Sequence, residues 1–252
     1  MTLRFPTTDW PLVAASRTRQ SEADPERSRS DTNDPLAELC RLYWPPVYAY
    51  LRQRGHRPEE AEDLTQGFFV HLLAKRVLDR AEPERGRLRS LLLVCLSNYV
   101  SNERTRSRAK KRGGADIVVI GPSLGDAQVT FEPTYDMTPE RIYERQWAMT
   151  LLRRVLLALR AEFTAAGNER VFDTLKSYLL GDKAEISYRD AASALNLTEG
   201  ATRVTVHRLR RRYRLLLWAE VARTLRGPRP DVAGEIRHLL GVLQSQPTES
   251  RP

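Results

Sequence analysis

Apolar residues recur every three or four positions along most of this 252-residue chain. The clearest stripe comprises Trp147, Leu151, Leu152, Val155, Leu156 and Leu159. Such spacing places side chains on one face of an α-helix, and strand patterns are nearly absent. Hydrophobic residues make up 41% of the chain, which is enough to give these helices a buried core. The sequence therefore predicts an all-α fold.

Segments rich in glycine, proline and polar residues interrupt the helical pattern. We expect two helical domains joined by a flexible linker. The expected parts are an N-terminal arm over 1–34, a first domain over 35–112, a linker over 113–137, a second domain over 138–225, and a C-terminal helix and tail over 226–252. Thr138 and Pro139 provide a cap and a first helical turn for the second domain.

The chain has a formal net charge of +9, which favours a polyanionic partner such as nucleic acid or anionic lipid. The basic helices lack the apolar face that lipid binding needs, so no membrane partner is expected. Cys40 and Cys95 lie in apolar helical patterns, which is typical of small buried side chains in a reducing compartment. No apolar run is long enough to cross a bilayer, and the N-terminus lacks the features of a signal peptide. We expect a cytoplasmic protein.

Residues 186–217, "ISYRDAASALNLTEGATRVTVHRLRRRYRLLL", combine two helical patterns with a tight turn. Ser187 can cap the first helix, Asn196 and Leu197 can form the turn, and Thr198 can cap the second helix. The second helix is expected to face inward through Thr202, Val206, Leu209, Tyr213 and Leu217. This arrangement predicts a helix-turn-helix, in which the second helix reads the major groove of DNA.

The second helix has six arginines between 203 and 214 and no acidic residue among them. The residues expected to share its outward face are Arg203, His207, Arg210 and Arg214, flanked by Val204, Arg208 and Arg211. Arginines in such a place pair with phosphates or with guanine edges. A solvated helix, or one that binds an acidic protein, is the alternative. DNA is favoured because the turn, the caps and the charge agree.

The first domain contains two further polar surfaces. In "RPEEAEDLTQGFFVHLL", residues 57–73, Asp63 and Gln66 lie on the polar side beyond the first turn, so a partner surface is expected there. Residues 88–114 present a hydrogen-bonding band of Ser97, Asn98, Ser101, Asn102 and Thr105, followed by a basic run that includes Arg104, Arg106, Arg108 and Lys110. These groups could read bases and hold phosphates, or could form a polar helix with a charged end. Spacing alone does not decide between the two.

In series, these segments resemble the sigma-70-type RNA polymerase sigma factors of the extracytoplasmic-function group. "EEAEDLTQGFF" resembles the helix that binds core polymerase, "LRSLLLVCLSNYVSNERTRSR" the promoter-melting helix, and "ISYRDAASALNLTEGATRVTVHRLRRRY" the helix-turn-helix of domain four. The resemblance covers most of the chain in the expected order. Leu88 and Leu91 depart from it, because members of the group usually have aromatic residues at those positions.

The resemblance implies two partners, core RNA polymerase and promoter DNA. Domain two would bind the polymerase clamp and open the minus-ten element, and domain four would bind the minus-thirty-five duplex. The polymerase-binding residues would be Asp63, Gln66 and Phe69. The DNA-binding residues would be Arg85, Arg87 and Arg89 of the loop Asp79–Ser90, Asn98, Asn102, Arg106 and Lys110 of the melting helix, and Arg203, Val204, His207, Arg208 and Arg211 of the recognition helix. An anti-sigma factor or another regulator is a further candidate partner.

Neither catalysis nor a cofactor is expected of this chain. Its four histidines are scattered and it has no CxxC pair, so the sequence suggests no nucleophile or metal site. The main alternative function is a helix-turn-helix transcriptional regulator that acts on duplex DNA without core polymerase. The first domain would then be a sensor or a dimerisation module.

Overall fold

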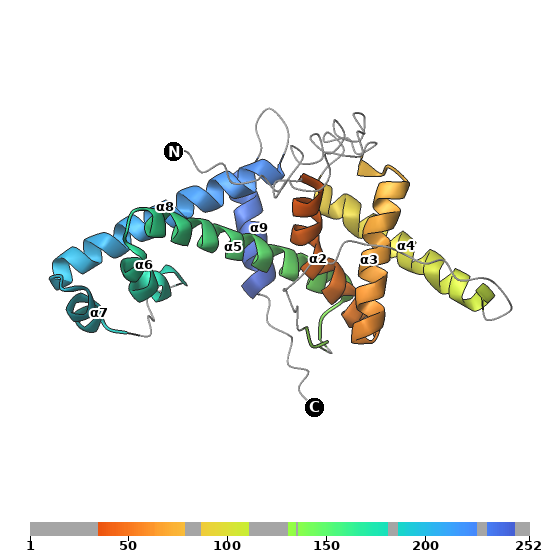
Figure 1. Ribbon diagram of the computed structural model, residues 1–252, viewed down its shortest axis with the longest axis horizontal. Helices are drawn as coiled ribbons and strands as arrows, with labels where there is room; N and C mark the ends of the chain where they lie inside the picture. The colour runs from red at the N-terminus through yellow and green to blue at the C-terminus, as the bar shows by residue number, and fades with distance from the viewer. Residues whose placement is uncertain are drawn as a thin grey trace, which may run out of the picture. The chain divides into compact units, whose positions relative to one another are not determined.

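The computed structural model describes residues 35–78, 87–110, 131–134, 136–180, 186–225 and 231–244. These residues form helices and no strand, so the all-α prediction is confirmed for them (Figure 1). The helices are α2 (Pro35–Gln53), α3 (Pro58–Ala74), α4 (Leu88–Lys110), α5 (Pro139–Ala165), α6 (Glu169–Leu175), the 3₁₀ helix η3 (Lys176–Leu180), α7 (Tyr188–Leu195), α8 (Glu199–Thr224) and α9 (Val232–Gln244). The expected N-terminal arm, most of the expected linker and Arg85 lie outside the described residues. None of the described helices is long and apolar enough to cross a lipid bilayer.

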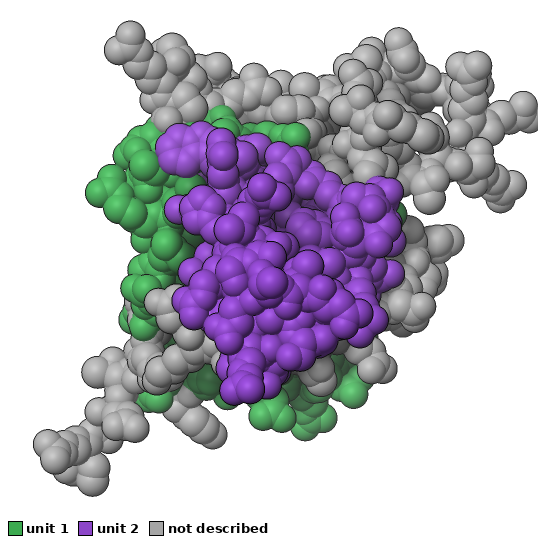
Figure 2. Space-filling view, turned by 90° about the vertical axis from the view of Figure 1, so that its left-hand side faces the viewer, with its two compact units in different colours: residues 1–150, 222–252 green, residues 151–221 purple. Residues whose placement is uncertain are grey.

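The chain divides into two compact units (Figure 2). Unit 1 comprises residues 1–150 and 222–252, and unit 2 comprises residues 151–221. The expected second domain began at residue 138, whereas the observed boundary lies inside α5, after Thr150. The expected C-terminal helix is observed as α9 and belongs to unit 1.

The core of unit 1 is built from α2, α3 and α4. Its largest fully buried side chains include Tyr43, Tyr50 and Leu51 of α2, Phe68 and Leu72 of α3, and Leu92 and Leu96 of α4. Aromatic rings join the three helices, because Trp44 stacks on Phe69 at 6.0 Å and Phe68 lies 5.8 Å from Tyr99. Pro58 opens α3 at its first position, as the sequence predicts, since that residue needs no backbone donor there.

Glycine permits a close approach between α3 and α4. A Cβ atom added at Gly67 would lie 2.3 Å from the hydroxyl oxygen of Tyr99, well inside van der Waals contact. Burial raises the pKa of Tyr99 to about 12, so the phenol that covers this glycine stays neutral. Close packing against Tyr99 therefore explains why glycine, which usually destabilises a helix interior, stands at position 67.

The first half of α5 packs within unit 1, which explains where the boundary falls. Met137 and Ile142 form a buried cluster with Ala49 of α2, and Phe131 packs against it. The side-chain amide of Gln53 donates to the carbonyls of Thr134 and Met137, and its oxygen accepts from the Thr134 N–H at 3.1 Å. Thr138 caps α5 by accepting from the Arg141 N–H at 3.3 Å, as predicted. Residues 131–134 and 136–150 thus belong to unit 1.

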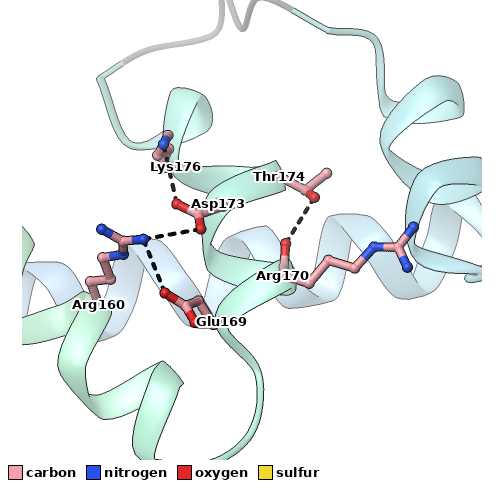
Figure 3. A network of polar contacts seen from close by, with 6 residues as sticks. All are labelled: Arg160, Glu169, Arg170, Asp173, Thr174 and Lys176. Atoms are coloured by element: carbon pink, nitrogen blue, oxygen red, sulfur yellow. Dashed lines mark hydrogen bonds and ion pairs between the residues drawn. The ribbon is translucent and has the colours of Figure 1, made fainter.

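Unit 2 has its own core. It consists of Leu159 of α5, Phe172 and Leu175 of α6, Tyr178 of η3, Ala191 of α7, and Val206 and Leu209 of α8. Polar contacts join α5 to α6 at the surface, where Arg160 Nη2 lies 3.0 Å from Glu169 and 3.4 Å from Asp173 (Figure 3). Arg170 donates to the Ala194 carbonyl at 2.8 Å and so links α6 to α7. Exposed ion pairs stabilise little, so the buried cluster is what positions α7 and α8.

Candidate nucleic-acid interface

Three polar residues define where α7 begins, where it ends and where α8 begins. Ser187 Oγ accepts from the Asp190 N–H at 3.2 Å and caps α7. Asn196 ends α7 in the left-handed conformation, with φ at 55°, which asparagine tolerates better than most residues. Thr198 Oγ1 accepts from the Ala201 N–H at 3.1 Å at the start of α8. The predicted caps and turn are confirmed, and they fix locally how α8 begins.

The inward face of α8 is the one that the sequence predicts. Thr202, Val206, Leu209 and Leu217 are buried, and Tyr213 is half-buried. Ala191 of α7 is buried in the same cluster as Val206 and Leu209 of α8, and Ala192 of α7 is also buried. The opposite side of α8 is consequently turned to solvent over its first four turns.

The exposed side of α8 presents five of the residues expected to bind DNA. They are Arg203, Val204, His207, Arg208 and Arg211, and together we call them the α8 face. The Arg203 side chain is 63% exposed, and its guanidinium lies over the ring of Tyr188 at 4.6 Å. Tyr188 is itself in contact with Tyr178, whose hydroxyl donates to the Ile186 carbonyl at 2.7 Å. A cation–π contact of this kind orients Arg203 while leaving it accessible.

Two other arginines of α8 make contacts inside unit 2. Arg210 was expected on the outward face, but it is half-buried and donates through Nε to the Tyr178 carbonyl at 2.8 Å. Arg212 makes a two-pronged pair with Glu162 of α5, with Nε 2.7 Å from Oε2. The hydrogen bond to Glu162 raises the pKa of Arg212. The arginines of α8 therefore fall into two groups. Some are exposed to solvent, whereas Arg210 and Arg212 contact other helices of unit 2 and help to hold α8 in place.

A second polar face runs along α4. Asn98, Asn102 and Arg106 are exposed at steps of four residues, so they line one side of the helix, and together we call them the α4 face. The hydroxyls of Ser101 and Thr105 donate to carbonyls one turn earlier, at 2.9 and 3.1 Å, so those donors are already used. Arg106 also pairs with Glu103 at 3.0 Å, and Lys110 is the last residue of α4.

Arg87 and Arg89 are held by the C-terminal helix. Arg89 is only 3% exposed, it pairs with Glu235 of α9, and its guanidinium lies 4.6 Å from the ring centroid of Trp147. Arg87 Nη2 lies 2.7 Å from the second oxygen of the same carboxylate. With α9 in this position, Arg89 has no access to DNA, which departs from the expected role. The cause is a buried acid that lies far away in the sequence.

Sequence reasoning did not find Glu235, although a signal for it exists. The apolar stripe of α9 comprises Val232, Ile236 and Leu239, and Glu235 falls on the same side. Glu235 is 1% exposed in the structure. A lone acid on the apolar side of a short helix indicates a buried cationic partner, because a charge is rarely buried unpaired.

The residues expected to bind polymerase separate into surface and core. Asp63 is exposed and Gln66 is half-buried, so both are reachable on α3. Phe69 is 6% exposed and stacks on Trp44, so it supports the core more than it offers a contact surface. Thr65, next to Gln66 in the chain, is fully buried and donates to the Ala61 carbonyl at 2.6 Å.

Within the described ranges, no group of three or more histidine, cysteine, aspartate or glutamate side chains is placed to hold a metal ion. Cys40 and Cys95 are not joined in a disulfide, and both are half-buried. Burial raises the pKa of the Cys95 thiol, which keeps it in the unreactive protonated form. No protein-family model, curated protein or solved structure matches the chain.

Proposed function

We propose that this protein is a bacterial sigma factor of the extracytoplasmic-function group, which binds core RNA polymerase, recognises promoter DNA and promotes strand opening. The observation that carries the proposal is the α8 face. Five residues suited to a DNA groove lie on the exposed side of a helix that begins at a capped turn. Three segments, in order along the chain, resemble the polymerase-binding, melting and duplex-reading helices of this group. This resemblance extends the proposal from DNA binding to a sigma factor.

The α8 face supports duplex recognition in a helix-turn-helix. In this motif the second helix enters the major groove, where arginine reads guanine edges and apolar groups contact thymine methyls. Val204 is 50% exposed within the basic face, as such a methyl contact requires. Arg208 and Arg211 are exposed and could reach either base edges or phosphates. Affinity should fall steeply with salt, because neutralising phosphates releases counterions.

The α4 face supports the capture of single-stranded DNA. Extruding a base costs a few kcal/mol, and a protein lowers that cost by holding the extruded base and the neighbouring backbone. Asn98 and Asn102 supply exposed amides for base edges, and Arg106 supplies a cation. The chain itself needs no catalytic group or cofactor in this mechanism, because polymerase makes the RNA.

The proposal is tested by run-off transcription and by co-sedimentation with bacterial core polymerase. We expect the purified chain to bind core polymerase and to direct transcripts from a subset of genomic fragments. Asp63→Ala combined with Gln66→Ala should weaken polymerase binding and leave duplex binding by the α8 face intact. Glu59→Gln, an exposed acid in the first turn of α3, is the matched control. Unchanged polymerase affinity in the double variant would contradict the role of this surface.

A regulator that acts on duplex DNA alone is the second candidate, and the same α8 face favours it. Such a protein would occupy a closed duplex tightly without polymerase. Binding to labelled duplex fragments, with and without core polymerase, separates the two functions. Tight duplex binding by a chain that never associates with polymerase would support the regulator and contradict the sigma-factor proposal.

A further inference from the structure

The helix α9 is docked on unit 1 through one side. Val232, Glu235 and Leu239 are buried, at three- and four-residue spacing, and Ile236 is half-buried. Asp231 caps the helix by accepting from the Gly234 N–H at 2.7 Å. At the edge of the contact, His238 Nε2 lies 3.7 Å from a carboxylate oxygen of Glu144 on α5. Of the three buried residues two are apolar and the third is the charged Glu235, so the charged centre of the contact matters to how α9 is held.

That centre is a single carboxylate shared by two arginines. One oxygen of Glu235 pairs with Arg89 and the other lies 2.7 Å from Arg87 Nη2. A DNA phosphate also presents two anionic oxygens, and guanidinium groups bind phosphate and carboxylate with the same geometry. The Arg87 side chain is 43% exposed even with α9 docked, so a phosphate can approach it from solvent.

Arg87 is aligned with the α4 face. Its carbonyl accepts from the N–H groups of Ser90 and Leu91, so its backbone forms the N-terminal cap of α4. Asn98 follows it by eleven residues, which is three helical turns and brings the two positions to the same side. The rise between them is roughly 16 Å, about the length of five nucleotides of one strand. One single strand could therefore contact Asn98 and Arg87 together.

The docked contact is not fully satisfied. Arg89 Nε, Trp147 Nε1 and Glu235 Oε2 are buried and make no hydrogen bond, so Oε2 faces Arg87 only as an ion pair. Burying such groups opposes docking, because each loses its hydrogen bond to water. Leu240 of α9 remains 43% exposed. A helix of 13 residues whose buried centre is charged and incompletely hydrogen-bonded is suited to reversible release.

We propose that α9 is an autoinhibitory element whose Glu235 occupies Arg87 in place of a phosphate of single-stranded DNA, with Arg89 holding the carboxylate there. Release of α9 returns Arg87 to the α4 face. This inference rests on the proposed function, because it assigns single-stranded DNA to that face. A permanent brace, in which Glu235 only stabilises unit 1, is the competing role and predicts a different result.

The test is a double-mutant cycle on the full chain, read by fluorescence anisotropy with a single-stranded oligonucleotide of twelve thymidines. Glu235→Gln keeps the shape and removes the charge, and it should tighten binding about fivefold or more. The salt slope of the logarithmic affinity should steepen by about 0.7, the value for one added phosphate contact on a single strand. Arg87→Ala should change little in the parent chain and should abolish the gain in the Glu235→Gln background.

Two controls keep the cycle decisive. Arg106→Ala, on the exposed α4 face, should weaken binding by the same factor in both backgrounds. Leu239→Ala loosens the docking of α9 without changing any charge, and it must reproduce the tighter binding if Glu235→Gln does not fold. A brace predicts lower stability with unchanged affinity in both variants, and that outcome overturns the proposal.

Failure of the autoinhibition proposal can be distinguished from failure of the sigma-factor proposal. Co-sedimentation of the parent chain with core polymerase is measured in parallel. If the parent chain binds polymerase but the cycle shows no coupling between Glu235 and Arg87, only autoinhibition fails. If the parent chain does not bind polymerase, the sigma-factor proposal fails, whatever the cycle shows.

Discussion

The helices α4 and α8 both have arginines near their N-terminal ends, and those arginines make different contacts. Arg87 and Arg89, at the start of α4, share one buried carboxylate from α9. Arg203 and Arg208, at the start of α8, are exposed, and the nearest acid to Arg203 is an exposed glutamate at 3.9 Å. A run of basic residues therefore does not by itself identify a DNA-binding site. What each arginine does depends on whether the fold supplies it with a desolvated partner.

Energetics sharpen this contrast. An exposed ion pair contributes about 0–1 kcal/mol, because water and salt screen it and ordering long side chains costs entropy. Removing one partner of a buried pair costs far more, since the other charge is left without compensation. Substitutions at the two helix starts should therefore affect different quantities: stability for Arg89, and DNA affinity for the α8 face.

The largest expected effect is on stability, at Arg89. Arg89→Ala leaves Glu235 with only Arg87 beside it and opens a space against Trp147, so unit 1 should lose up to about 3–5 kcal/mol, and less where α9 releases and returns Glu235 to water. Urea unfolding followed by tryptophan fluorescence measures this loss. The matched control is Arg106→Ala, whose side chain is 72% exposed and should change stability by less than about 1 kcal/mol. Equal effects of the two substitutions would remove the contrast between a buried and an exposed arginine of α4.

The second effect is on DNA affinity, at the α8 face. Arg203→Ala combined with Arg208→Ala should cost about 1–3 kcal/mol for each arginine that contacts a base edge. The free energy of unfolding and the affinity for core polymerase should change little, because both side chains are exposed. Arg153→Ala, an exposed arginine of α5, serves as the control. Equal losses of promoter and polymerase binding in the double variant would count against a role specific to DNA.

The sequence predicts what local interactions decide. Helical spacing identifies the inward side of α8, and Ser187, Thr198 and Thr138 act as the expected caps, because capping involves residues only three positions apart. Contacts between distant residues could not be predicted this way. Glu235 lies 146 positions from Arg89, and Gln53 lies 81 positions from Thr134. The first contact joins α9 to the start of α4 and buries Arg89, and the second joins the segment before α5 to α2.

The third effect concerns how closely each helix is approached by its neighbour. Gly67 of α3 lies against Tyr99 of α4, whereas Ala191 of α7 packs in one buried cluster with Val206 and Leu209 of α8. Gly67→Ala should destabilise the chain by about 1–3 kcal/mol through overpacking, offset by up to about 1 kcal/mol of helix propensity. Adding Tyr99→Phe removes the oxygen that clashes and should recover most of the loss. Chemical denaturation of the single and double variants measures the coupling, and strictly additive losses would show that the hydroxyl contact is not the cause.

The smallest expected effect lies at the turn that sets the start of α8. Asn196 has a φ of 55°, and alanine in that conformation costs about 1–2 kcal/mol because its Cβ crowds the following carbonyl. Asn196→Ala should destabilise unit 2 by about 1 kcal/mol, whereas Asn196→Gly, which has no Cβ, should stay close to the parent chain. Thermal unfolding of the two variants side by side measures the difference. Equal melting temperatures would mean that the left-handed residue does not determine how α7 passes into α8, and that the α8 face depends on the buried core of unit 2 alone.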